Sequence, residues 1–180
     1  MKNIAFLVFT SIIWQSCNPD KTTRIDLETP TFKTTDASEL FFKNVRQTYY
    51  EVEDLKAARL LVYKSKELLK EETLVFPQIV HNWYEDEAYI LLEFDSRVQE
   101  LKQFSLLWKD EKGTWQGKQY PLVDKKVHYE IARSIYNNIL DEHQLYISTP
   151  DDTLEYMHQK SEQEAFRKTM VDFYRLVNKY

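Results

Sequence analysis

Residues 74–95 read LVFPQIVHNWYEDEAYILLEFD, and they carry the clearest secondary-structure signal in the chain. Two apolar-rich runs, 77–83 and 88–94, flank an acidic tip over residues 84–87, and this pattern predicts a β-hairpin. The predicted register pairs Trp83 with Ala88, His81 with Ile90, Ile79 with Leu92, Asn82 with Tyr89, Val80 with Leu91, and Gln78 with Glu93. One face is then nearly all apolar and the other mixed, which indicates an antiparallel sheet covered on one side.

A second hairpin is predicted over residues 104–120. Asp110-Glu111-Lys112-Gly113 forms a good turn, with Gly113 supplying the left-handed position. In this register Trp108 lies opposite Trp115 and Leu106 lies opposite Gly117. A cross-strand Trp pair of this kind stabilises a sheet by up to about 1 kcal/mol relative to small residues.

Residues 38–53 allow two interpretations. A helix capped by Ser38 would place four apolar residues on one face: Phe41, Val45, Tyr49 and Val52. A strand would suit the aromatic pairs at 41–42 and 49–50. Residues 59–66 alternate in polarity after Leu60, so we favour two strands joined by a loop over 53–58.

The helices are predicted in the last third of the chain. Over 124–142, Asp124 can cap a helix whose apolar stripe is Val127, Ile131, Ile135, Ile139 and Leu140. A short strand is expected over 144–148, and Thr149-Pro150-Asp151-Asp152 is typical of a helix start. Ser161–Glu164 matches a capping box and predicts a last helix that buries Phe166, Met170, Phe173, Tyr174 and Val177.

The order of these elements predicts the fold class. Strands come first and helices last, which indicates an α+β fold. We expect an antiparallel sheet of about four to six strands, built from consecutive hairpins, with C-terminal helices on one face. A single domain is expected over residues 37–180.

The chain begins MKNIAFLVFTSIIWQSC, with one charge at Lys2 and an apolar run over 4–14. A helix of that length rises roughly 16 Å, about half the thickness of a bilayer's hydrocarbon core. The pattern therefore favours a secretory signal over a membrane-spanning helix. Cys17, at the exit of the run, is the only cysteine in the chain.

Ser16-Cys17 at the end of this apolar run resembles the lipobox of bacterial lipoproteins. In that family the cysteine thiol receives a diacylglyceryl group, a peptidase cuts before the cysteine, and the new amine is usually acylated. The resemblance implies that residues 1–16 are a cleaved signal peptide and that Cys17 is the lipidated N-terminus. Several acyl chains make a stable anchor. The alternatives are an ordinary cleaved signal and an N-terminal core segment.

The segment after the cysteine is expected to be a tether. Residues 17–36 are rich in Thr and Pro and have no periodic apolar pattern. The alternative is an edge strand through Phe32. In some bacterial lipoproteins an Asp after the cysteine retains the protein in the inner membrane. Asn18 stands at that position here, which favours the outer membrane of the cell envelope.

Composition excludes several function classes. The chain has a formal charge of −5, and removing residues 1–16, whose only charge is Lys2, makes it −6. Such a chain is a poor candidate for nucleic-acid binding, which depends on Lys and Arg. Gly113 and Gly117 are the only glycines, so the phosphate-binding glycine loops of nucleotide sites are absent from the sequence. We expect no cofactor.

No catalytic or metal motif stands out. His81, His128, His143 and His158 show no metal-ligand spacing, and His81 is expected to be a hydrogen-bonded core residue. There is no nucleophile elbow. Paired carboxylates could cleave glycosides, and the candidates are Glu85, Asp86 and Glu87 at the hairpin tip, with Asp151 and Asp152. Solvation at a turn and the helix dipole at a helix start already explain all five, and we favour that interpretation.

Aromatic residues offer the remaining candidate surface. Trp83, Trp108 and Trp115 are assigned to the core, although they could instead form a stacking platform. The mixed hairpin face, with Asn82, Tyr84 and Tyr89, is the most open candidate binding surface. We expect a membrane-anchored envelope lipoprotein acting as a non-enzymatic accessory or binding component, with an envelope protein or a glycan as its partner. The alternatives are a carboxylate-dependent glycan hydrolase and a carbohydrate-binding module.

Overall fold

The computed structural model describes residues 24–25, 32–99 and 103–180. Its principal elements are α2 (Asp36–Phe41), β1 (Tyr50–Leu55), β2 (Leu60–Ser65), β3 (Val75–Asn82), β4 (Glu87–Phe94), α3 (Ser96–Gln99), β5 (Gln103–Lys109), β6 (Trp115–Pro121), α4 (Lys125–Leu140), β7 (Gln144–Ser148), β8 (Thr153–Tyr156) and α5 (Lys160–Leu176). The predicted α+β class with antiparallel strands is confirmed.

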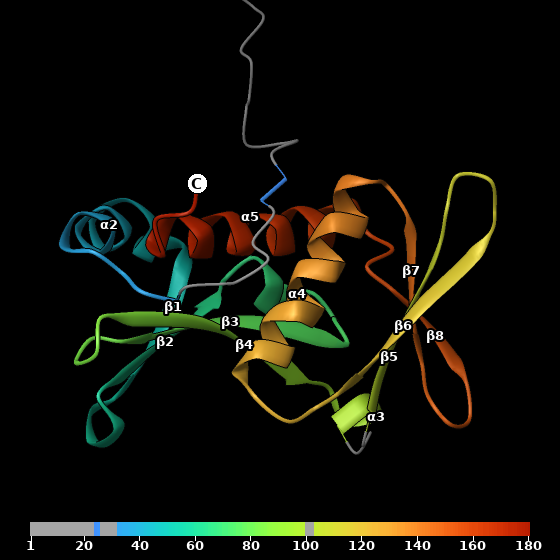
Figure 1. Ribbon diagram of the computed structural model, residues 1–180, viewed down its shortest axis with the longest axis horizontal. Helices are drawn as coiled ribbons and strands as arrows, with labels where there is room; N and C mark the ends of the chain where they lie inside the picture. The colour runs from blue at the N-terminus through green and yellow to red at the C-terminus, as the bar shows by residue number, and fades with distance from the viewer. Residues whose placement is uncertain (1–23, 26–31, 100–102) are drawn as a thin grey trace, which may run out of the picture.

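The strands form two sheets. The first has the order β1-β2-β3-β4, so it is built from consecutive hairpins as expected. The second has the order β6-β5-β7-β8, and all its pairs are antiparallel. Figure 1 shows α5 lying across one face of the first sheet, α4 crossing beside it, and the second sheet beyond α4. We expected one sheet of about four to six strands. The described residues contain eight strands because they form a second sheet.

Residues 38–49 are helical, so the favoured strand interpretation was wrong there and holds only from Tyr50 on. α2 continues through a π turn (Phe42–Arg46) and a 3₁₀ turn (Gln47–Tyr49) before β1 begins. Thr35, rather than Ser38, caps the helix, and the Thr35 and Ser38 hydroxyls accept each other's backbone N–H. This helix buries Phe42, whose ring centroid lies 4.9 Å from that of Tyr63.

The β3–β4 hairpin has the predicted faces but a different register. Ile79 pairs with Ile90 and His81 with Ala88, a shift of two residues. The loop covers residues 83–86, because the Asn82 side-chain oxygen accepts from the backbone N–H groups of Tyr84 and Glu85. Side chains alternate with a period of two, so the shift leaves the residues that stay in the two strands on their expected faces, while Trp83 moves into the loop.

The β5–β6 hairpin is displaced by one residue from the prediction. Lys109 pairs with Trp115 and Leu107 with Gly117, so Trp108 and Trp115 lie on opposite faces. The predicted cross-strand Trp pair was wrong. The Asp110 carboxylate accepts from the backbone N–H groups of Lys112 and Thr114, which creates a five-residue loop.

Thr149–Asp152 does not start a helix. It forms the turn between β7 and β8, in which the Thr149 N–H donates to the Asp152 carbonyl at 2.8 Å. The Thr149 hydroxyl accepts the Asp152 N–H at 3.0 Å. The same residue types favour turns and helix starts, and the strand pairing of β8 with β7 decides between them.

The core lies between helices α4 and α5 and the inner faces of both sheets. Asp124 caps α4 as predicted, and its carboxylate accepts from the backbone N–H groups of Lys126 and Val127. α5 begins after Gln159 instead of at the predicted capping box. The predicted inward residues of α5 are all buried: Phe166, Met170, Phe173, Tyr174 and Val177.

Part of the expected tether packs on the domain. Ile25 and Phe32 are buried in the core cluster, and Lys33 forms an isolated antiparallel bridge with Glu87 of β4. The Ala88 N–H donates to the Phe32 carbonyl at 2.8 Å. The edge-strand alternative through Phe32 thus describes this segment better. Residues 1–23, including Cys17, lie outside the described residues.

Candidate functional site

The three residues of the predicted binding surface have separate local roles. Asn82 closes the β3–β4 loop, as described above. Tyr84 is exposed, and the Arg59 guanidinium lies 4.0 Å from its ring centroid. Tyr89 is half-buried, with the Lys125 ammonium 5.0 Å from its ring centroid. Asn82 and Tyr84 thus belong to the β3–β4 loop, whereas Tyr89 is on β4 beside Lys125.

Four of the five predicted acids lie in turns, and Glu87 begins β4. Glu85 and Asp86 are exposed at the β3–β4 tip, and Glu87 contacts Lys125 at 3.1 Å and Lys33 at 3.4 Å. These two ammonium groups lower the pKa of Glu87, the Lys125 hydrogen bond most strongly. Asp151 and Asp152 are exposed in the β7–β8 turn.

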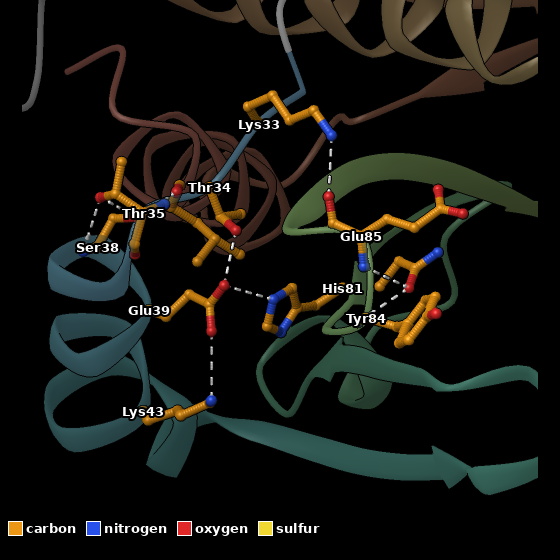
Figure 2. A network of polar contacts seen from close by, with 11 residues as sticks. Lys33, Thr34, Thr35, Ser38, Glu39, Lys43, His81, Tyr84 and Glu85 are labelled. Carbon is orange, nitrogen blue, oxygen red and sulfur yellow. Dashed lines mark hydrogen bonds and ion pairs between the residues drawn. The ribbon is translucent and has the colours of Figure 1, made fainter.

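His81 has a carboxylate neighbour rather than a group of metal ligands. Its Nε2 lies 3.0 Å from Oε1 of Glu39, which also accepts from the Thr34 hydroxyl at 2.7 Å. Figure 2 shows this network joining α2 to the β3–β4 hairpin, with Lys43 on the other carboxylate oxygen of Glu39. Burial lowers the pKa of His81, although the Glu39 charge opposes the shift. The network holds the N-terminal helix on the first sheet.

His128 and His143 each have a hydrogen-bond partner of their own. The Leu92 N–H donates to Nδ1 of His128, and Nδ1 of His143 lies 2.8 Å from the side-chain oxygen of Asn138. The part of the chain that the structure describes contains no group of three or more His, Cys, Asp or Glu side chains suited to a metal ion. His158 differs from the other three because it lines a cavity.

That cavity, named here the Glu162 pocket, has a volume of about 460 Å³. It lies where the N-terminus of α5 meets β8, the loop before β3, and α3. Its lining is mostly charged: Lys70, Glu71, Glu72, Leu74, Arg97, Glu155, Tyr156, Met157, His158, Gln159 and Glu162. The volume falls in the range of about 300–1,000 Å³ that small-molecule sites occupy.

Glu162 is the most perturbed acid in this pocket. It is only 5% exposed, and burial raises the pKa of its carboxyl. The Thr73 hydroxyl, the His158 side chain and the Gln159 backbone N–H oppose the shift, while the Glu71 charge adds to it. A buried acid with a raised pKa in a cavity is a functional-site candidate.

The sequence did not identify this pocket. Glu162 was expected within the capping box of the last helix. In the structure it is the third residue of α5, and the backbone N–H of Gln159 before the helix works against the rise in the pKa of its carboxyl. Its neighbours come from residues 70–74, 97 and 155–159, which only the topology brings together.

Replacing Glu162 with Gln is expected to flatten the pH dependence of stability. Because the folded pKa lies above the ordinary 4.5, the unfolded chain releases this proton first as pH rises. Stability contributed by the protonated carboxyl is therefore present below pH 4.5 and lost as pH rises through the folded pKa. Urea unfolding of both proteins from pH 4 to 8 measures the difference.

The matched control is Glu155→Gln, since Glu155 lines the same pocket but is exposed. The wild-type pH slope should persist in that variant. If the free energy of unfolding of Glu162→Gln depended on pH as strongly as that of the wild type, the raised pKa assigned to Glu162 would be contradicted.

The three tryptophans of the domain are in different environments. Trp83 is 47% exposed at the β3–β4 tip, Trp115 is 51% exposed on the second sheet, and Trp108 packs partly buried against the core. The predicted core assignment therefore fits Trp108 but was wrong for Trp83 and Trp115.

Comparison of the chain with models of known protein families, with characterised proteins and with solved structures finds no match. Among the described residues, no helix combines the length and apolar character needed to span a bilayer.

Proposed function

We propose that the protein is a lipid-anchored lipoprotein of the cell envelope, held through Cys17 and preferentially in the outer membrane. Its folded domain is a non-enzymatic binding component. The N-terminal sequence supports the anchor, and the Glu162 pocket supports the binding role. No nucleic acid is involved, since the charge balance of the chain is negative.

The charge pattern of the Glu162 pocket carries the binding proposal. Lys70, Arg97 and His158 face the same cavity as four glutamates. A ligand with both amino and carboxyl groups would pair with both kinds of side chain. Soluble disaccharide-peptide fragments of the cell wall have this chemistry, and they occur in the proposed location.

A hydrolase acting on glycan is the second candidate. One observation favours it: the Glu71 charge lies close enough to Glu162 to raise the pKa of that carboxyl. A protonated acid beside an ionised one is the arrangement that glycosidases use.

Calorimetric titration with cell-wall disaccharide-peptides tests the binding role. The wild type should bind, and Arg97→Ala should weaken binding about tenfold, because a charge-assisted hydrogen bond contributes roughly 1.5–3 kcal/mol. Arg59→Ala, an exposed arginine at the tip of the first sheet, is the control and should bind as the wild type does.

An assay for reducing ends distinguishes binding from hydrolysis. The proposed function predicts that no new reducing ends appear when the protein is incubated with purified cell wall. Release of reducing ends that is lost in Glu162→Gln would establish the hydrolase instead. Absence of both binding and release would contradict both candidates.

A further inference from the structure

The outer face of the second sheet is the starting observation. The strand register places three rows of side chains on it: Trp115, Lys109 and Gln144; Gly117, Leu107, Tyr146 and Glu155; and Gln119, Ser105, Ser148 and Thr153. All are exposed or half-buried, whereas the opposite face carries buried Phe104, Leu106, Tyr120, Leu145 and Ile147. Figure 1 shows this sheet at the end of the molecule beyond α4.

A shallow hollow lies on this face. It has a volume of about 410 Å³ and is lined by Leu107, Trp115, Gln116, Gly117 and Thr153. We name it the Trp115 hollow. Trp115 is the one exposed large apolar side chain that the described residues place on this face.

The Trp115 ring is held by two neighbours. Its centroid lies 4.8 Å from that of Tyr146 at an interplanar angle of 54°, and the Lys109 ammonium lies 5.1 Å from it. A ring fixed in this way loses little freedom when a ligand stacks on it. The tilt between the two rings leaves one stacking surface, that of Trp115, rather than a flat aromatic pair.

Gly117 shapes the floor of the hollow. A Cβ at this position would lie 2.4 Å from Cδ2 of Leu107, so any larger residue would displace the Leu107 side chain. Glycine therefore lets Leu107 lie close to the neighbouring strand. The chain contains only two glycines, and this one is in the middle of β6.

The polar groups around the hollow are mostly uncharged. Thr153 lines it, and the same sheet face adds Ser105, Gln119, Gln144 and Ser148. Amide and hydroxyl groups beside one exposed aromatic ring suit a ligand that is polyhydroxylated and neutral. A protein partner would need a complementary area of about 1,000 Å² or more, which one exposed large apolar side chain does not favour.

We propose that the Trp115 hollow binds a neutral glycan, with one sugar ring stacked on the Trp115 indole and its hydroxyls bonded to Thr153 and to Ser148 beside it in the same row. This is a second site, beyond the binding role assigned to the Glu162 pocket. Thr153 lines the hollow and Glu155 lines the Glu162 pocket. The two residues are two positions apart on β8, a separation of roughly 7 Å along the strand. A glycan seated in the hollow would thus extend toward the Glu162 pocket.

Calorimetric titration with neutral hexasaccharides tests this proposal on the mature protein in a detergent without a sugar head group. The probes are cellohexaose, laminarihexaose, chitohexaose and mannohexaose, which lack the charges that the Glu162 pocket would recognise. At least one should bind, and Trp115→Ala should weaken its binding at least tenfold. Gly117→Ala should also weaken binding, because Leu107 must move.

Trp83→Ala is the matched control, since Trp83 is exposed to a similar extent on the first sheet. It should bind as the wild type does, and circular dichroism should show all variants folded. Failure of all four probes to bind at millimolar concentration would overturn the proposal, as would equal loss in Trp83→Ala and Trp115→Ala. Disaccharide-peptide binding that survives in Trp115→Ala would leave the Glu162 pocket proposal intact.

Discussion

Asp172→Ala is expected to lower the free energy of unfolding by about 3 kcal/mol. The Asp172 carboxylate is 1% exposed. It accepts two hydrogen bonds from the Arg46 guanidinium, at 2.7 and 3.0 Å, and one from the Tyr50 hydroxyl at 2.7 Å. Removing it leaves a partly buried cation and a buried hydroxyl without their acceptor, and such groups are costly.

The position of this ion pair explains why the effect should be large. Asp172 is on α5, Arg46 is in the π turn after α2, and Tyr50 begins β1. The cluster therefore joins the last helix to the first elements of the domain. Burial and the Asp172 charge together raise the pKa of Tyr50, so its hydroxyl stays a donor at neutral pH.

Urea unfolding measures the loss, with Asp54→Ala as the control because Asp54 is an exposed acid on β1. The control should change stability by less than about 0.5 kcal/mol. The double variant Arg46→Met/Asp172→Leu should lose less than Asp172→Ala alone, since no charge is then left unpaired. A loss below about 1 kcal/mol in Asp172→Ala would contradict this account.

Cys17→Ser is expected to abolish lipid attachment completely. The lipobox resemblance implies that the Cys17 thiol receives a diacylglyceryl group, and serine has no thiol to receive it. Each acyl methylene buried in the bilayer contributes about 0.8 kcal/mol, so losing several chains removes the anchor. In cells fed an alkyne-labelled palmitate, the wild type should carry the label and the variant should not.

The variant should also keep residues 1–16, because the peptidase of this family cuts only before a lipidated cysteine. Ser11→Ala, a change inside the same apolar run, is the control and should be labelled and cleaved normally. Label on the serine variant, or cleavage of it at residue 17, would count against the resemblance.

Local periodicity explains which parts of the fold could be predicted. The inward faces of β3 and β4 follow from the alternation of apolar and polar residues, and that of α4 follows from apolar residues spaced four apart. An error in the strand register by two residues does not change these faces. The registers could not be predicted, because they depend on side chains in the loops. Asn82 and Asp110 cap their loops through backbone N–H groups, and this moves each hairpin by one or two residues.

The candidate sites were harder to predict than the fold. The Glu162 pocket draws on α5, β8, α3 and the loop before β3, which are far apart in sequence. The Trp115 hollow was hidden by a one-residue error, because the predicted register turned Trp115 inward to meet Trp108. A five-residue loop ending at Thr114 places it on the open face instead.

The central claim is that this domain is anchored to a membrane of the cell envelope through an acylated Cys17. The most direct test is the intact mass of the wild-type protein purified from detergent-solubilised envelope. The account predicts a chain that begins at Cys17 and carries the mass of a diacylglyceryl group and an N-acyl chain. A mature chain that begins elsewhere, or that begins at an unmodified Cys17, would contradict it.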